Sequence, residues 1–241
     1  MDTLHLAFPK PRMIAHRGVS GLEKENTCSA FVAAGNRSYF GVETDVHVTA
    51  DGQFIIIHDD TTKRVALDDL TVENSTFETL RSLRLCDRDG LRGRKDLILP
   101  SLSEYVQICK KYEKVSVLEL KNHMQPQDID GIIAVIQAEN WLDKTIFISF
   151  DLPNIIYVRQ KLPDQKAQYL AGGDADWDAV MDALNRYRLD LDAHFSLITE
   201  ERLQALHALG KEVNVWTVDR LEDARRLADW GVDYITSNII E

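Results

Sequence analysis

Short apolar segments rich in β-branched residues recur along the chain, and amphipathic stretches with a helical period separate most of them. Strands are predicted at residues 13–16, 41–48, 54–58, 115–120, 145–150, 168–171, 189–195, 212–218 and 233–237. Helices are predicted at residues 27–37, 102–113, 127–141, 178–187, 199–210 and 221–231. Several helical patterns begin with a capping residue and end at glycine, and Ser101 with Glu104 has the spacing of a capping box.

Strands that alternate with helices indicate βαβ units, and such units build a parallel sheet. The alternation continues along the whole chain, which favours a closed barrel over an open doubly wound sheet, and no G-x-G-x-x-G segment opens it. A length of 241 residues fits one barrel domain or two smaller domains. We therefore predict an α/β fold of the TIM (β/α)8 barrel type, as a single domain over residues 1–241.

Some features depart from a regular barrel pattern. Nine predicted strands compete for eight places, so one of them, with 189–195 as the candidate, is expected to be short or peripheral. Residues 49–53 are too few for a parallel crossover, and Asp51-Gly52 is typical of a hairpin turn. Residues 60–98 form a charged, weakly periodic insertion, which we expect to cap the active-site face.

Composition and charge narrow the partners and the location. The chain is 44% hydrophobic and 28% charged, and it lacks the long apolar run of a membrane span. The formal charge of −11 disfavours nucleic acid and anionic membranes as partners, although a local cation can still receive a small phosphorylated substrate. No signal-peptide pattern is visible, and the three cysteines suggest neither a disulfide framework nor a metal site. We expect a cytoplasmic protein without stable membrane association; its oligomeric state stays open.

Residues of catalytic types stand at or near the ends of the first predicted strands. His16-Arg17-Gly18 offers an imidazole for proton transfer and a guanidinium for a phosphate, although an incidental strand end would look the same. Glu43 and Asp45 point to one face of a strand, where two carboxylates repel unless a cation or a proton lies between them. Oxygen ligands favour Mg²⁺ or Ca²⁺ over Zn²⁺, although a solvent-facing pair on an edge strand would give the same pattern.

Later strands end in similar side chains. His58 and Asp59 stand at the end of one strand. Glu119 and Lys121 stand at the end of another and point to the same face. Glu119 could bind a metal and Lys121 a phosphate, or the two side chains could form an internal ion pair. Trp216 is expected to form an apolar pocket wall, or else part of the core. Barrel active sites lie where strands end. Together these side chains predict phosphodiester cleavage, in which a hard cation polarises phosphoryl oxygens and two imidazoles move protons.

In their order and spacing, these motifs resemble the glycerophosphodiester phosphodiesterase family. The matching segments are His16-Arg17-Gly18, Lys24-Glu25-Asn26-Thr27, Glu43-Thr44-Asp45-Val46, Thr49-Ala50-Asp51-Gly52, His58-Asp59, Leu99-Pro100-Ser101-Leu102, Leu118-Glu119-Leu120-Lys121 and Val215-Trp216-Thr217-Val218. The likeness covers nearly the whole chain, and the combination over residues 16–59 is far more specific than its parts. Lys24 stands where the family usually has Pro, and Ser237-Asn238 where it commonly has Asp-Pro. The second departure leaves the role of the last loop open.

The resemblance implies a TIM barrel of the phospholipase-C-like phosphodiesterase type, with residues 60–98 as an insertion after the third strand. It implies one divalent cation, Mg²⁺, Ca²⁺ or Mn²⁺, and glycerophosphocholine or glycerophosphoethanolamine as the substrate, cleaved to glycerol 3-phosphate and an alcohol. Which imidazole is acid and which is base, and whether a cyclic phosphate forms, stay open. The implied site comprises His16 and His58 for acid–base catalysis, Glu43, Asp45 and Glu119 for the metal, Arg17 and Lys121 for phosphate, and Trp216 for glycerol.

Other functions fit the same chain. A lysophospholipase D-type or sugar-phosphodiester hydrolase would use the same barrel, and an apolar lip on residues 60–98 would favour the lipid substrate. That segment is mostly polar, which favours a soluble substrate. A non-catalytic binding module is the alternative from another class; loss of a ligand or an imidazole would support it, and all of them are present.

Overall fold

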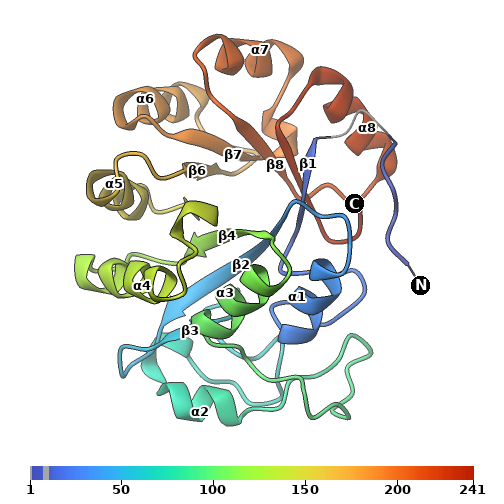
Figure 1. The fold of residues 1–241 in the computed structure, drawn as a ribbon, viewed down its shortest axis with the longest axis vertical. Helices are drawn as coiled ribbons and strands as arrows, with labels where there is room; N and C mark the ends of the chain where they lie inside the picture. Colours follow the sequence, from blue (N-terminus) through green and yellow to red (C-terminus); the bar gives the residue numbers. More distant parts are fainter. Residues whose placement is uncertain (1, 8–10) are drawn as a thin grey trace.

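Eight parallel strands close into a barrel in the computed structural model, which describes residues 2–7 and 11–241 (Figure 1). Around the barrel the order is β1-β9-β8-β7-β6-β5-β4-β2, and β2 pairs with β1 to close it. The predicted TIM barrel is therefore confirmed. The strands are β1 (Arg12–Ala15), β2 (Gly41–Val48), β4 (Val115–Leu120), β5 (Thr145–Ser149), β6 (Ala167–Ala171), β7 (Asp190–His194), β8 (Val213–Trp216) and β9 (Tyr234–Ser237).

Helices surround the barrel (Figure 1). Some of them begin at predicted caps: Thr27 accepts from the backbone of Ala30, and Ser101 with Glu104 forms the expected capping box. Gly231, in the left-handed conformation with φ of 93°, ends the last helix. The helices are α1 (Cys28–Gly35), α2 (Phe77–Ser82), α3 (Leu102–Lys111), α4 (Pro126–Ala138), α5 (Leu152–Lys161), α6 (Trp177–Tyr187), α7 (Glu200–Ala208) and α8 (Leu221–Trp230), with 3-10 turns η1 (Val72–Asn74), η2 (Leu142–Lys144) and η3 (Phe195–Leu197).

The strand outside the barrel is β3 (Phe54–Ile56), which pairs antiparallel with β2. Gly52 has a φ of 72° in the connecting turn, and its N–H donates to the Thr49 carbonyl at 2.9 Å, so the expected hairpin is confirmed. The expectation that 189–195 would be the peripheral strand was wrong, because β7 pairs with β6 on one side and β8 on the other. Because the hairpin connection is too short for a crossover, β3 cannot run parallel to β2 and lies outside the ring of parallel strands.

Residues 60–98 build a small apolar cluster of their own on β3. Ile55 faces this cluster, and Ile57 follows just beyond the strand. Full burial of one such aliphatic side chain stabilises a fold by about 1.5–3 kcal/mol. The insertion therefore has a small core of its own, which its weakly periodic sequence did not indicate. Its other buried members are Val65, Ala66, Val72, Leu80, Leu83, Leu85, Leu97 and Leu99.

Alternation along the barrel strands separates an outer apolar layer, packed on the helices, from an inner one. On β4, Leu118 belongs to the outer layer, whereas Val117 belongs to the inner cluster. Glu119 points the same way as Val117 but lies nearer the C-terminal end of the strand, where barrel active sites form. Among the described residues, no helix is long and apolar enough to cross a membrane.

Candidate active site

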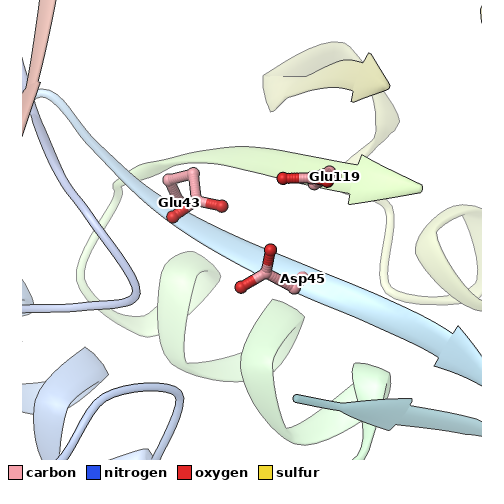
Figure 2. A group of neighbouring side chains, drawn as sticks. All are labelled: Glu43, Asp45 and Glu119. Carbon is pink, nitrogen blue, oxygen red and sulfur yellow. The ribbon is translucent and has the colours of Figure 1, made fainter. Parts of the chain in front are cut away.

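Three carboxylates from neighbouring strands meet inside the barrel. Glu43 and Asp45 project from β2 and Glu119 from β4, pointing toward one another (Figure 2). Asp45 stands opposite Glu119 in the β2–β4 register, and one oxygen from each of the three lies within 4.8 Å of the others. All three side chains are buried. The alternative of a solvent-facing pair on an edge strand was wrong, because β2 is paired with β1, β3 and β4.

The electrostatics of this cluster fit a hard divalent cation. Burial, together with the charge of Asp45, raises the pKa of Glu43 well above its ordinary value and the pKa of Glu119 to about 7. Burial acts on Asp45 in the same direction, but Arg17 and Lys121 hold the pKa of that carboxyl well below its ordinary value. Asp45 Oδ1 is buried without a hydrogen-bond partner. Such an oxygen-only set, with one oxygen that accepts no hydrogen bond, suits Mg²⁺ or Ca²⁺.

His16 follows β1 and lies beside the cluster. Its Nε2 is 3.9 Å from Glu43 Oε2, and its Nδ1 is 2.7 Å from Asn238 Oδ1. The amide of Asn238 is oriented by Asp219, whose Oδ2 accepts from Asn238 Nδ2 at 2.6 Å. Oδ1 therefore acts as the acceptor, which places the imidazole proton on Nδ1. Burial, and next the charge of Arg17, lower the pKa of His16 to about 4.

His58 follows β3 and has a carboxylate partner. Its Nδ1 is 2.7 Å from Asp59 Oδ1, and Arg64 donates from Nε to Asp59 Oδ2 at 2.6 Å. Arg64 also makes two hydrogen bonds to Glu25, at 2.6 and 2.9 Å. Burial lowers the pKa of His58, while Asp45 and Asp59 act in the opposite direction. The Nε2 atom is therefore the ring nitrogen left for chemistry.

Arg17 and Lys121 bring positive charge to the carboxylates. The backbone N–H of Arg17 donates to Glu43 Oε2 at 2.8 Å, and its side-chain Nε lies 3.6 Å from Asp45 Oδ2. Lys121 Nζ lies 2.8 Å from Glu119 Oε1 and 3.7 Å from Asp45 Oδ1. The alternative of an internal Glu119–Lys121 ion pair is thus present, and it forms part of the carboxylate cluster. Arg17 Nε is buried without a hydrogen-bond partner.

A pocket with about 410 Å³ of open space joins these residues. Trp216 forms part of its wall, as expected, and packs edge-on against Phe150 and His194 at ring-centroid distances of 5.7 and 5.3 Å. The pocket is lined by His16, Arg17, Glu43, His58, Glu119, Ile148, Phe150, Leu170, Asp192, Trp216, Thr217 and Thr236. Asp45 and Lys121 lie immediately beside it through their contacts with Arg17 and Glu119.

Comparison with known proteins decides the family. The model of the Glycerophosphoryl diester phosphodiesterase family matches residues 16–241. The chain belongs to this family. The predictions of the family and of a glycerophosphodiester phosphodiesterase enzyme are therefore confirmed, against the alternative of a non-catalytic binding module.

Individual relatives span nearly the whole chain. The glycerophosphodiester phosphodiesterase of Caldanaerobacter subterraneus subsp. tengcongensis is 29% identical, over 95% of this chain and 94% of its own. A phosphodiesterase of Oleispira antarctica, solved in complex with the product sn-glycerol-3-phosphate, has a TM-score of 0.85 at 24% identity, covering 95% of this chain and 93% of that one. The glycerophosphodiester phosphodiesterase of Thermotoga maritima has a TM-score of 0.78 at 22% identity, covering 96% of both chains. The solved structures support the fold.

Several residues around this family's motifs were not singled out from the sequence. Asn26 Nδ2 donates to Asp45 Oδ2 at 2.7 Å and accepts on Oδ1 from Thr44 Oγ1, also at 2.7 Å. Glu25 and Asp59 stood inside recognised motifs, yet nothing in the sequence indicated that Arg64 would join them. Asp192, Phe150, Thr217 and Thr236 line the pocket, and alternation alone would have placed Asp192 inside the barrel.

Proposed function

We propose that this protein hydrolyses glycerophosphodiesters, such as glycerophosphocholine and glycerophosphoethanolamine, to glycerol 3-phosphate and an alcohol, with a divalent cation and a pair of histidines. The proposal rests mainly on one pocket that is lined by two imidazoles and by Glu43 and Glu119, two of the three carboxylates of the buried cluster. The Oleispira antarctica relative, bound to sn-glycerol-3-phosphate, supports the same class of product for this chain.

Glu43, Asp45 and Glu119 are the residues proposed to hold the cation, which would be Mg²⁺ or Ca²⁺, with Mn²⁺ accepting the same oxygens. When bound, the cation supplies charge neutralisation for the three carboxylates and polarisation of a phosphoryl oxygen. Arg17 and Lys121 are proposed to bind the phosphate, because both cations border the cluster and the Nε of Arg17 has no hydrogen-bond partner.

His16 is proposed as the general base. Its proton is held on Nδ1 by Asn238, so Nε2 is free to accept one, and its lowered pKa keeps the imidazole neutral near pH 7. The Nε2 atom would remove the proton from a water molecule, or from the glycerol 2-hydroxyl if a cyclic phosphate forms first. In both routes, His16 Nε2 would accept a proton from the attacking hydroxyl group or water.

His58 is proposed as the general acid. Asp59 accepts from Nδ1 and opposes the lowering of the His58 pKa by burial, Arg17 and Lys121. As the acid, Nε2 would carry the proton that the leaving alcohol oxygen takes up. Trp216 is proposed to pack on the glycerol, since its ring forms an apolar wall of the same pocket. The insertion at 60–98 is proposed to cap this face, because Arg64 reaches from it to Glu25 and Asp59.

The experiment that tests this function is glycerol 3-phosphate release from both substrates, with Mg²⁺, with Ca²⁺ and with chelator. We expect chelator to abolish activity, and His16→Ala or His58→Ala to lower kcat at least about 100-fold, the scale of acid–base catalysis. His207→Ala, on the outer helix α7, is the matched control. Mg²⁺ should also raise the Tm of the wild type but not of Glu43→Gln. Full activity in chelator contradicts the metal assignment, and normal turnover by both histidine variants contradicts the mechanism.

A lysophospholipase D-type activity is favoured by one observation. Leu67 and Leu91, both in the insertion, are 73% and 66% exposed, and they adjoin Asp68 and Arg92, which are joined by a 2.7 Å hydrogen bond. Two neighbouring exposed leucines would suit contact with an acyl chain. Hydrolysis of lysophosphatidylcholine at a rate above that of glycerophosphocholine, lost in Leu67→Ser/Leu91→Ser, would establish it. The cytoplasmic location and the absence of a nucleic-acid partner stay predictions from the sequence.

A further inference from the structure

Asp192 is a buried carboxyl group in the pocket that the proposed proton transfers do not use. It lies on β7, is 2% exposed, and lines the same pocket as His16 and Glu119. In residues 2–7 and 11–241, no lysine, arginine or histidine nitrogen forms an ion pair with it, and its Oδ1 has no hydrogen-bond partner. A buried polar atom without a partner is costly, so a polar group of a bound molecule would stabilise it. The neighbouring amide nitrogen of Asn214, Nδ2, is also buried without a hydrogen-bond partner.

Asp192 stands across the barrel from the proposed metal cluster. In the closed order β2-β4-β5-β6-β7-β8-β9-β1, β7 is four strands from β2, half of the ring in either direction. Glu43 and Asp45 lie on β2 and Glu119 on the next strand, β4. A phosphate held beside those carboxylates by Arg17 and Lys121 would therefore direct one of its organic substituents toward Asp192.

Part of the wall between the two sides is apolar, although Thr217 and Thr236 also line the pocket. Ile148 and Leu170 line it from β5 and β6, and Trp216 lines it from β8, next to Asp192 in the sheet order. The backbone carbonyl of Asp192 also lies 3.4 Å from the Trp216 ring nitrogen, which fixes the wall. These surfaces suit a short carbon chain, and Asp192 offers that chain a buried carboxyl group at the far side.

The chemistry of Asp192 matches a hydroxyl group better than a phosphate or a cation. Burial, with Glu119 nearby, raises the pKa of Asp192 well above its ordinary value, although the neighbouring Asn214 amide acts in the opposite direction. A neutral carboxyl group both donates and accepts a hydrogen bond, as a hydroxyl does. The phosphate has its proposed cations, Arg17 and Lys121, on the opposite side of the barrel. Glu119, whose charge acts on Asp192, is proposed to bind the metal and not a positive head group.

We propose that Asp192 binds a hydroxyl group of the substrate's glyceryl moiety and so selects hydroxyl-bearing phosphodiesters over plain alkyl ones. This inference rests on the proposed function of the pocket. It assigns Asp192 to recognition, with no part in proton transfer.

The test compares the binding of glycerol 3-phosphate and of n-propyl phosphate, which has the same chain without hydroxyls, by calorimetry with the Mg²⁺-loaded protein. We expect the wild type to prefer glycerol 3-phosphate by about tenfold or more, because a polar site that is left unpaired discriminates strongly. Asp192→Leu should lose this preference, and Asp192→Asn, which keeps a donor and an acceptor, should retain most of it. Asp190→Asn, at the other end of β7, is the matched control.

Turnover gives an independent readout. In Asp192→Leu, kcat/KM for glycerophosphocholine should fall about tenfold or more, while kcat/KM for bis(4-nitrophenyl) phosphate, which lacks hydroxyls, stays unchanged. Equal losses on both substrates, or an unaltered preference in calorimetry, would overturn the proposal. A loss of phosphocholine binding with glycerol 3-phosphate unaffected would do so as well, by assigning Asp192 to the head group. Because calorimetry needs no turnover, failure of the wild type to hydrolyse any glycerophosphodiester would refute the proposed function separately.

Discussion

The side chain that orients His16 comes from the opposite end of the chain. Asn238 lies 222 residues further on, and its Oδ1 accepts both from His16 Nδ1 and from Ser20 Oγ, the latter at 2.5 Å. Its amide is held in turn by Asp219. The last loop, whose role the departure at Ser237-Asn238 left open, therefore decides which imidazole nitrogen of the proposed base is free.

We expect Asn238→Ala to lower kcat for glycerophosphocholine roughly 10- to 100-fold, the range for partners that orient a functional imidazole, with a smaller change in KM. Without the acceptor, the Nδ1 proton is no longer fixed, and part of the enzyme holds the tautomer in which Nε2 is occupied. Steady-state kinetics measures this effect. Ser20→Ala is the control, because it removes the other hydrogen bond to Asn238 Oδ1, and a 2.9 Å bond to the backbone carbonyl of His16, while the imidazole keeps its acceptor. An unchanged kcat in Asn238→Ala would show that another group sets the tautomer.

At the scale of elements, one side chain of the insertion reaches two residues of the proposed site through their carboxylate partners. Arg64 makes paired hydrogen bonds to Glu25 and to Asp59, and these carboxylates in turn contact Arg17 and His58. Hydrogen bonds to Glu25 and Asp59 raise the pKa of Arg64. Partial burial alone would raise the pKa of Glu25, but Arg64 and Arg17 lower it to about 2. One arginine thus links the proposed acid to a proposed phosphate ligand.

Arg64→Gln should therefore reduce kcat about tenfold or more while changing the Tm by only a few degrees. The Arg64 side chain is 45% exposed, and ion pairs at such positions contribute little to the free energy of unfolding. Kinetics and thermal denaturation of the same preparation separate the two effects. Arg92→Gln, which breaks the exposed ion pair with Asp68 in the same insertion, should leave both unchanged. A parallel loss of activity and stability in Arg64→Gln would instead mean that Arg64 only holds the insertion together.

The sequence was most informative about elements whose pattern is local. Apolar, β-rich segments predicted every barrel strand, although 189–195 was wrongly expected to be the peripheral one, and Asp51-Gly52 predicted the β2–β3 hairpin. The same-face rule brought Glu43 and Asp45 together. Helix α5 was missed because β-branched Ile155, Ile156 and Val158 weaken its helical pattern, even though Asp151 caps it. Contacts such as Asn238 with His16 depend on barrel closure, which no local pattern encodes.

At the scale of the whole molecule, the two ends of the barrel carry different chemistry. The proposed site lies toward the C-terminal ends of the strands, whereas Glu212 organises a network at the opposite end. Arg12 Nη2 lies 2.8 Å from Glu212 Oε1, Tyr234 donates to Oε2 at 2.7 Å, and Lys166 pairs with the same carboxylate. Arg12 also stacks over the Tyr234 ring, 4.1 Å from its centroid. These contacts join the starts of β1, β6, β8 and β9, which indicates a structural role.

This network makes stability depend on pH in a definite direction. Partial burial alone would raise the pKa of Glu212, but hydrogen bonds from Lys166, Tyr234 and Arg12 lower it to about 2. A carboxyl group whose folded pKa lies below its unfolded value, about 4.3, stabilises the fold above that value and loses the effect as pH falls toward the folded pKa. Because Lys166 is half-exposed, solvent screening reduces the contribution to about 1 kcal/mol at pH 7.

Glu212→Gln should therefore lower the free energy of unfolding by about 1 kcal/mol at pH 7. The difference from the wild type should shrink between about pH 4.3 and about pH 2, because the carboxyl group takes up its proton over this range. Urea denaturation across this range measures it. Glu222→Gln, at a 79% exposed side chain on α8 paired with Arg220, is the control and should show no such difference. A gap between Glu212→Gln and the wild type that persists at pH 2 would mean that the side chain acts through packing, with its charge contributing nothing to barrel closure.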